Sequence, residues 1–287
     1  MAAGHKRILQ AFLASEVTEG AGCRLSRALP TTQLRNLDPF MLFDHLTNAT
    51  GQFPDHPHRG FEVVAYVIDG LVRHEDFLGC TGETSAGGGQ WFTAGKGIVH
   101  AEKLDSRSVH AIVVWVNLRS DMKFVAPAYQ QFTMGSIKRA EDKGAGISAT
   151  ILAGSALGET ADTFTRTPAA FVDFQMQSGA VLTHPLPPGW NTLLYVLDGR
   201  VTVAGRSFGS KEAVVLTVEE ATVQVTAENA CRFIILSGQP LNEPCVQYGP
   251  FVMNSRDQIV QAFDDYERGT NGFEGAPTWR SQLFYGR

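Results

Sequence analysis

Short runs of Val, Ile, Leu and Phe alternate along the chain with stretches rich in glycine and proline. Each run has the length of a β-strand and is bounded by residues that favour turns. The clearest runs are 63-VVAYVI-68, 110-HAIVVWVNL-118, 193-LLYVL-197, 213-AVVLTV-218 and 231-CRFIIL-236. The pattern predicts an all-β fold of the sandwich or barrel type. The apolar stretch at the N-terminus, which is broken by Gln10, is interpreted as a first strand rather than as a signal peptide.

One segment near the C-terminus has helical periodicity instead. Ser255 is a candidate N-cap, and Gln258, three residues later, completes a capping box. Ile259 and Phe263 follow at helical spacing, and Gly269 is a candidate terminator. We expect a short C-terminal helix that serves packing rather than chemistry.

An internal repeat indicates two copies of one β-domain. The segment 61-FEVVAYVIDGLV-72 matches 190-WNTLLYVLDGRV-201 at an offset of 129 residues. Both copies contain Asp-Gly after the strand, which is a strong signal for a tight turn. The domain boundary is therefore expected between residues 121 and 165. We assign residues 1–135 to an N-terminal domain and residues 136–287, including the helix, to a C-terminal domain.

Composition and charge exclude some classes of function. The chain has 287 residues and a formal net charge of −5, so its surface has no general attraction for nucleic acid. No apolar run reaches the length of about 18 residues that a transmembrane helix needs, so no membrane partner is expected. The four cysteines lie far apart and form no C-x-x-C motif, which favours free thiols in a reducing compartment over a thiolate metal site.

Two pairs of candidate metal ligands stand in the N-terminal copy. His56 and His58 are separated by one residue, and His100 and Glu102 have the same spacing after a glycine-rich turn. Alternate residues of a strand share a face, so each pair is expected to point into the domain. On facing strands the two pairs would bring three imidazoles and one carboxylate to one divalent first-row metal, such as iron, zinc, nickel, copper or manganese. An octahedral ion would keep two positions open for chemistry.

The second copy of the repeat lacks this feature. The offset places Pro185 and Pro187 where His56 and His58 stand in the first copy. The difference predicts a metal site in the N-terminal domain only.

Other residues near the two pairs have competing interpretations. Glu62 follows His58 by four residues and shares its strand face, so the residues alone do not rank it against Glu102 as a ligand. Phe53 and Trp91 flank the two pairs and are candidate pocket-lining residues, although an ordinary core role fits them equally well.

The two clusters resemble the two motifs of the cupin superfamily, and within it the pirin family. The first motif is represented by His56, His58, Glu62 and Gly70, and the second by Gly95, Gly97 and His100. Further matching stretches run through nearly the whole chain: 37-LDPFMLFDH-45, 53-FPDHPHRGFE-62, 90-QWFTAGKGIVHAE-102, 115-WVNLRS-120 and 249-GPFVMNS-255. The sequence departs from the family pattern at two places. The family has an acidic residue after the first glycine where this chain has 87-GGG-89, and Phe92 stands where methionine is common in the family.

The resemblance implies two tandem cupin-type β-sandwich domains with one mononuclear iron ion per chain, held in the N-terminal domain. It implies His56, His58, His100 and Glu102 as the ligands, and it removes Glu62 from that set. It also implies similarity to quercetin 2,3-dioxygenases, which cleave the central ring of a flavonol with O2. In that reaction Glu102, when it is released from the iron, is our candidate general base for the flavonol 3-hydroxyl.

The resemblance implies a second function as well, namely an iron- and redox-dependent transcriptional coregulator that binds a nuclear transcription factor. For either function we expect a monomer in the cytoplasm, the nucleus or both, without direct binding of nucleic acid. The expected partners are a flavonol-like small molecule and O2 for the first function, and a transcription factor for the second.

Overall fold

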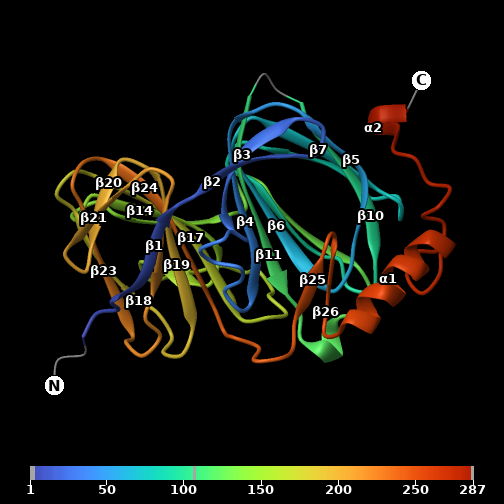
Figure 1. The fold of residues 1–287 in the computed structure, drawn as a ribbon. Helices are drawn as coiled ribbons and strands as arrows, with labels where there is room; N and C mark the ends of the chain where they lie inside the picture. The colour runs from blue at the N-terminus through green and yellow to red at the C-terminus, as the bar shows by residue number, and fades with distance from the viewer. Residues whose placement is uncertain (1–3, 106–107, 286–287) are drawn as a thin grey trace. The chain divides into compact units, whose positions relative to one another are not determined.

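The fold is built from antiparallel β-strands that form two compact units (Figure 1). The structure is a computed structural model and describes residues 4–105 and 108–285. The N-terminal unit comprises Ser15–Pro30, Phe40–Ser136 and the chain from Leu241 onward. The C-terminal unit comprises the chain up to Ala14, Thr31–Pro39 and Ile137–Pro240. The predicted all-β fold with two related domains is confirmed.

The N-terminal unit is a sandwich of a seven-stranded and a four-stranded sheet. The large sheet contains, in spatial order, β12 (Ala128–Phe132), β9 (Gly89–Thr93), β6 (Phe61–Asp69), β11 (Val109–Asn117), β4 (Phe40–Ala49), β3 (Cys23–Leu29) and β2 (Ser15–Glu19). The small sheet contains β5 (Gln52–His58), β10 (Ile98–Leu104), β7 (Leu71–Asp76) and β8 (Thr81–Ser85). Val67 of the large sheet packs in one apolar cluster with Val72 and Leu104 of the small sheet. Burial of this shared core holds the two sheets face to face.

The C-terminal unit repeats the same arrangement. Its large sheet contains β1 (Ile8–Leu13), β22 (Glu212–Leu216), β19 (Asn191–Asp198), β24 (Cys231–Gly238), β17 (Ala169–Met176), β14 (Ile147–Ala153) and β13 (Lys138–Asp142). Its small sheet contains β18 (Val181–Pro185), β23 (Thr222–Ala227), β20 (Arg200–Val203) and β21 (Arg206–Gly209). The repeated segments form β6 and β19, which occupy the same place in their sheets. Each strand is followed directly by a glycine with positive φ, Gly70 at 93° and Gly199 at 73°, so the sequence repeat corresponds to a structural one.

The two ends of the chain belong to different units from those that we predicted. The predicted boundary at 135/136 lies next to the division between Ser136 and Ile137, but strand β1 pairs with β22 and completes the C-terminal unit. It occupies the edge that β12 occupies in the N-terminal unit. The chain from Leu241 onward returns to the N-terminal unit. Its elements are β25 (Val246–Tyr248), β26 (Phe251–Met253), α1 (Arg256–Arg268) and α2 (Gln282–Tyr285).

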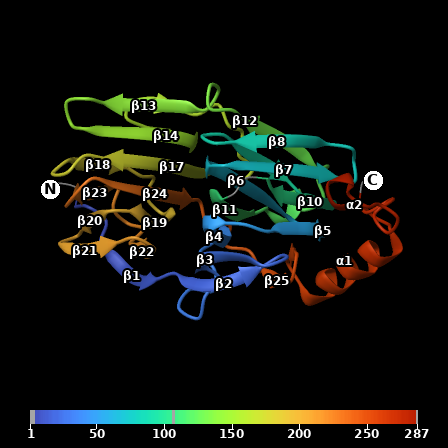
Figure 2. The ribbon, with the colours of Figure 1, turned by 90° about the horizontal axis from the view of Figure 1, so that it is seen from above.

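Helix α1 is formed as its capping residues predict. The Ser255 side chain accepts a hydrogen bond from the Gln258 backbone N–H at 3.2 Å, and Gly269 ends the helix with φ of 67°. Gln258 reaches back to the backbone N–H of Asn254 at 2.9 Å, one residue before the N-cap. The helix contacts β25 and β26, lies beside β25 in Figure 2, and buries Ile259 in the cluster that contains Phe251 and Met253 of β26. The described helices are all too short or too polar to cross a membrane.

Three short elements complete the fold. The first is the 3₁₀ turn η1 (Ser120–Met122), and the other two are the strands β15 (Ser155–Ala156) and β16 (Glu159–Thr160), which form a small hairpin.

Candidate metal centre

Two neighbouring strands of the small sheet carry the predicted histidines. Strands β5 and β10 pair antiparallel, so that His100 lies opposite His56 and Ile98 lies opposite His58. We predicted facing strands for the two ligand pairs, whereas the structure places them side by side in one sheet. Because alternate residues share a face, the imidazoles converge on the interior of the sandwich without any contribution from a flexible loop.

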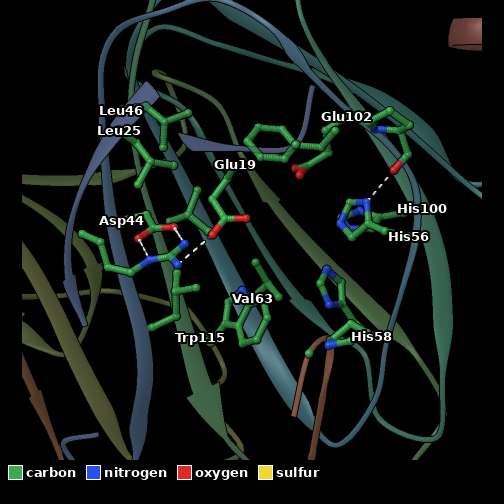
Figure 3. A pocket seen from close by; sticks show the side chains of 18 of the residues that line it. Glu19, Leu25, Asp44, Leu46, His56, His58, Val63, His100, Glu102 and Trp115 are labelled. Carbon is green, nitrogen blue, oxygen red and sulfur yellow. Dashed lines mark hydrogen bonds and ion pairs between the residues drawn. The ribbon is translucent and has the colours of Figure 1, made fainter. Parts of the chain in front are cut away.

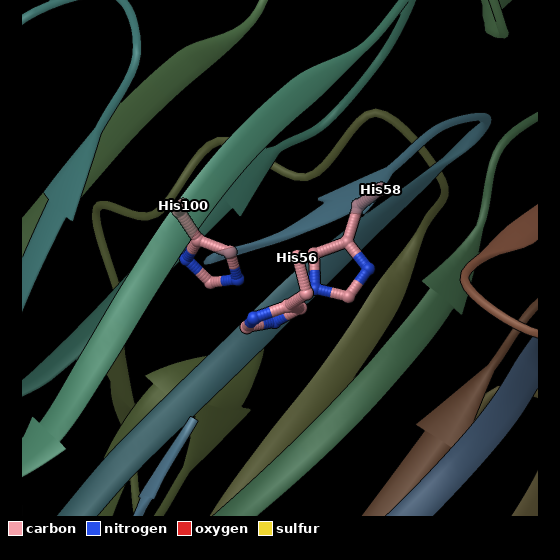
Figure 4. A group of neighbouring side chains, drawn as sticks. All are labelled: His56, His58 and His100. Atoms are coloured by element: carbon pink, nitrogen blue, oxygen red, sulfur yellow. The ribbon is translucent and has the colours of Figure 1, made fainter. Parts of the chain in front are cut away.

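The three imidazole rings form a compact cluster (Figure 4). Their ring centroids are 4.3 Å apart for His56 and His100, 4.7 Å for His56 and His58, and 4.9 Å for His58 and His100. One nitrogen of each ring lies within 4.8 Å of the nitrogens of the other two. Three imidazole nitrogens at this spacing can ligate one metal ion.

The hydrogen bonds of the cluster leave ligand nitrogens without partners. His56 Nδ1 donates to the Pro54 carbonyl at 2.8 Å, which leaves Nε2 of that ring as the acceptor. In the described part of the chain, the buried atoms His58 Nδ1 and His100 Nε2 have no hydrogen-bond partner. Each unpaired buried atom costs about 1–3 kcal/mol in free energy. A metal ion bound at these nitrogens would remove that cost, so the residues fit the group that the sequence predicted.

Burial also keeps the cluster uncharged. Desolvation lowers the pKa of His56, and it lowers the pKa values of His58 and His100 well below the ordinary value. Repulsion from neighbouring imidazoles acts in the same direction for His58 and His100. Neutral imidazole is the form that binds a metal, so the cluster is ready for binding near neutral pH.

Aromatic side chains enclose the cluster. Phe61 and Trp115 each lie 5.2 Å from His58 between ring centroids, and Phe92 lies 5.1 Å from His100. Phe92, which departs from the pattern of the family, therefore forms part of the wall behind the imidazoles. These rings exclude water from the back of the cluster and restrict the rotation of its members.

Glu102 shares the pocket of the histidines but does not belong to the cluster of mutually close ligand atoms. A β-bulge between His100 and Glu102 alters the pairing of β10 with β5, so that Glu102 lies opposite Phe53. Burial raises the pKa of the Glu102 carboxyl to about 7. Its roles as fourth ligand and as general base stay predictions.

Glu62, the rival carboxylate, is held within the large sheet. Its side chain is fully buried and accepts hydrogen bonds from Trp91 Nε1 at 3.0 Å and from Thr93 Oγ1 at 2.7 Å. Both oxygens are therefore engaged away from the imidazoles. The same contact favours the core role over the pocket-lining role for Trp91, which is buried against Glu62 and is not among the residues that line this pocket. Phe53, the other candidate, does line it.

The imidazoles form part of the wall of a pocket of about 660 Å³ within the N-terminal unit (Figure 3). That volume lies in the range of small-molecule sites. Its walls are apolar along much of their length, through Leu25, Leu46, Val63 and Trp115 among others. Part of the wall comes from the returning C-terminal segment, through Gln247, Gly249 and Pro250.

Sequence reasoning missed a polar group in the pocket wall, formed by Glu19, Arg27 and Asp44. The three residues lie on strands β2, β3 and β4 and match no spacing motif. The register of β3 with β4 sets Arg27 opposite Asp44, and the pairing of β2 with β3 adds Glu19 to the group.

The C-terminal unit has an apolar core where the N-terminal unit has the cluster. Strands β18 and β23 occupy the places of β5 and β10, and they set His184 opposite Val223. His184 is buried beside Phe174, with ring centroids 5.1 Å apart, and Val225 packs in the same core. Valines offer no ligand atoms, so the described residues of this unit form no comparable group of ligands.

The fold and the cluster together define a protein with two cupin-type domains, of which one carries a candidate three-histidine metal site. Family models for the pirin family match at residues 22–116, and for the pirin C-terminal cupin domain at residues 171–272. The chain belongs to the pirin family.

Individual relatives agree with this assignment. The chain is 40% identical to "Pirin" of Mus musculus over 290 residues, covering 98% of this chain and 99% of that one. It is also 40% identical to "Pirin" of Homo sapiens, covering 97% and 98% of the two chains. Among solved structures, a quercetin 2,3-dioxygenase from Acinetobacter baumannii superimposes with a TM-score of 0.85 at 32% identity, covering 93% of this chain and 98% of that one.

Proposed function

We propose that the protein is an iron-dependent dioxygenase that cleaves the central ring of a flavonol such as quercetin. One observation carries the proposal: buried, uncharged imidazoles with unpaired nitrogens line a largely apolar pocket of about 660 Å³. The similarity to a quercetin 2,3-dioxygenase at 32% identity and a TM-score of 0.85 supports the choice of substrate.

His56, His58 and His100 would hold the metal, with Glu102 as the predicted fourth ligand. When bound, the metal supplies Lewis acidity that lowers the pKa of the flavonol 3-hydroxyl beside the 4-carbonyl. The remaining steps belong to side chains of the pocket. The Glu102 carboxylate would accept the hydroxyl proton, and Phe53, Val63 and Trp115 would hold the flat rings and exclude water.

Aerobic turnover of quercetin by the iron-loaded protein tests the proposal. We expect loss of the flavonol absorbance together with release of carbon monoxide. His56→Ala should abolish turnover, and Glu102→Gln should lower kcat by about 10²–10⁴-fold, which is the usual contribution of general base catalysis. Glu83→Gln is the matched control, because it removes a carboxylate of the same unit that pairs with Arg73 at the surface and lies outside the pocket. Turnover by the His56→Ala variant at the wild-type rate would contradict the proposal.

The predicted role as a redox-dependent coregulator is a second proposal, and so is residence in the cytoplasm or nucleus. Oxidation from Fe(II) to Fe(III) would add one positive charge within the pocket, part of whose wall is formed by Gln247, Gly249 and Pro250 of the returning segment. A comparison of partner recovery with reduced and oxidised iron tests this role, and equal recovery in both states would contradict it.

A further inference from the structure

The polar group of Glu19, Arg27 and Asp44 lies in the wall of the pocket away from the imidazoles (Figure 3). Arg27 Nε and Nη2 donate to the two oxygens of Asp44, each at 2.7 Å, and Nη1 donates to Glu19 Oε1 at 2.8 Å. The geometry with Asp44 is bidentate, which is the strongest arrangement of this ion pair.

Two of the three residues have an evident structural role. Arg27 and Asp44 are directly opposite each other on β3 and β4, so their pair joins these strands across the sheet. Their side chains are only 16% and 7% exposed. Glu19 is different, because its side chain is 44% exposed and the pairing of β3 with β4 does not need it.

The group carries one positive and two negative formal charges, so it is net acidic. The guanidinium directs three of its five N–H groups at carboxylates, and it is nearly buried. The two carboxylates would therefore repel an anionic group of a ligand, and the guanidinium is already paired with them. A hydroxyl group would instead find an acceptor in the exposed carboxylate of Glu19.

Apolar side chains line the pocket between Asp44 of this group and His58 (Figure 3). Leu25 and Leu46 lie near Asp44, and Val63 and Trp115 lie between Asp44 and His58 (Figure 3). The pocket thus has a metal-binding end, an apolar middle and an acidic end. A flat aromatic molecule with chelating oxygens at one side and hydroxyl groups on an outer ring matches that order.

We propose that Glu19 is a specificity-determining residue, which accepts a hydrogen bond from a hydroxyl group on an outer ring of the substrate. The proposal rests on the proposed flavonol dioxygenase function and narrows its substrates to polyhydroxylated flavonols. It excludes flavonols that carry a carboxylate or sulfate at that ring, because the acidic group would repel them.

Two ligands isolate the contribution of Glu19. Quercetin and 3-hydroxyflavone share the chelating 3-hydroxyl and 4-carbonyl groups, but only quercetin has hydroxyl groups on its outer rings. Their dissociation constants are measured by titration of the full-length, iron-loaded protein without O2, so that no turnover occurs. The comparison uses wild type, Glu19→Gln and the control Glu83→Gln.

We expect wild type to prefer quercetin, and we expect Glu19→Gln to reduce that preference about tenfold, since a hydrogen bond to a charged group is replaced by a neutral one. Glu83→Gln should leave the preference unchanged. An unchanged preference in Glu19→Gln, with both ligands still bound, would overturn the role of Glu19 alone. If neither flavonol binds to the wild type, the proposed function is overturned, and the role of Glu19 with it.

Discussion

His56 and His100 lie directly opposite each other on neighbouring antiparallel strands, with their ring centroids 4.3 Å apart. Hydrogen bonding between β5 and β10 fixes this separation, and His58 joins the pair from the next inward-facing position of β5. The candidate ligands are therefore positioned by sheet geometry before any metal binds. A site preorganised in this way loses little free energy to ordering of its ligands on binding.

The first prediction concerns metal content. We expect one first-row metal ion per chain, bound at His56, His58 and His100. His100→Ala removes one candidate ligand. Loss of a residue that only hydrogen-bonds to a ligand already weakens metal affinity by about 10–100-fold, so loss of a ligand itself should weaken it by at least about tenfold. Elemental analysis of protein purified without chelators measures the content. His5→Gln, at an exposed position, should retain the metal of the wild type.

The second prediction concerns stability. Metal binding to the folded cluster satisfies the buried nitrogens of His58 and His100, so chelation should lower the thermal midpoint of the wild type. A metal present at about 100 times its dissociation constant contributes about 2.7 kcal/mol to the free energy of unfolding. Scanning calorimetry with and without chelator measures the shift. The His56→Ala variant should show little response, and a response equal to that of wild type would place the metal elsewhere.

Much of the site could be predicted because its signals are local. The spacing of His56 and His58 is the period of a strand, and it is readable without the fold. The two ends of α1 could be predicted from Ser255 and Gly269, because helix capping depends only on residues that are close in sequence.

Other features depend on pairing between distant segments. The ion pair of Arg27 with Asp44 arises from strand register, and the placement of β1 beside β22 joins residues about 200 positions apart. Trp91 was a candidate for the pocket or for the core because it stands near the ligands in sequence, and its indole N–H in fact donates to Glu62 inside the sheet. Local periodicity carries no information about such partners.

The third prediction concerns the segment that returns to the N-terminal unit. Arg59, next to His58, pairs with Asp265 of α1 at 2.7 Å, and the two side chains are only 1% and 2% exposed. Asp265→Ala would leave the buried guanidinium without its counter-ion, at a cost of about 3–5 kcal/mol in the free energy of unfolding.

Asp264→Ala is the matched control for this experiment. Asp264 is the adjacent residue of the same helix, and its pair with Arg268 lies at the surface, where such pairs contribute about 0–1 kcal/mol. Urea unfolding of the metal-loaded variants measures both effects. Equal losses of stability in the two variants would show that the buried pair does not anchor the helix.

The last prediction concerns pH and the second unit. Burial lowers the pKa of His184 from 6.5 to about 4. The unfolded chain therefore takes up a proton at this residue as the pH falls through 6.5, whereas the folded chain does so only near 4. Stability due to neutral His184 is fully present above pH 6.5 and is lost between these values, by up to about 3 kcal/mol.

Other groups titrate over the same interval, so the difference between wild type and His184→Leu isolates this contribution. Leucine cannot be protonated and suits the apolar surroundings of Phe174 and Val225. The free energy of unfolding of metal-loaded protein is measured in urea at several values from about pH 4.5 to about pH 7.5, that is, from about two units below to about one unit above the ordinary histidine pKa of 6.5. The variant should lose less stability than wild type as the pH falls, and parallel curves for the two proteins would contradict the prediction.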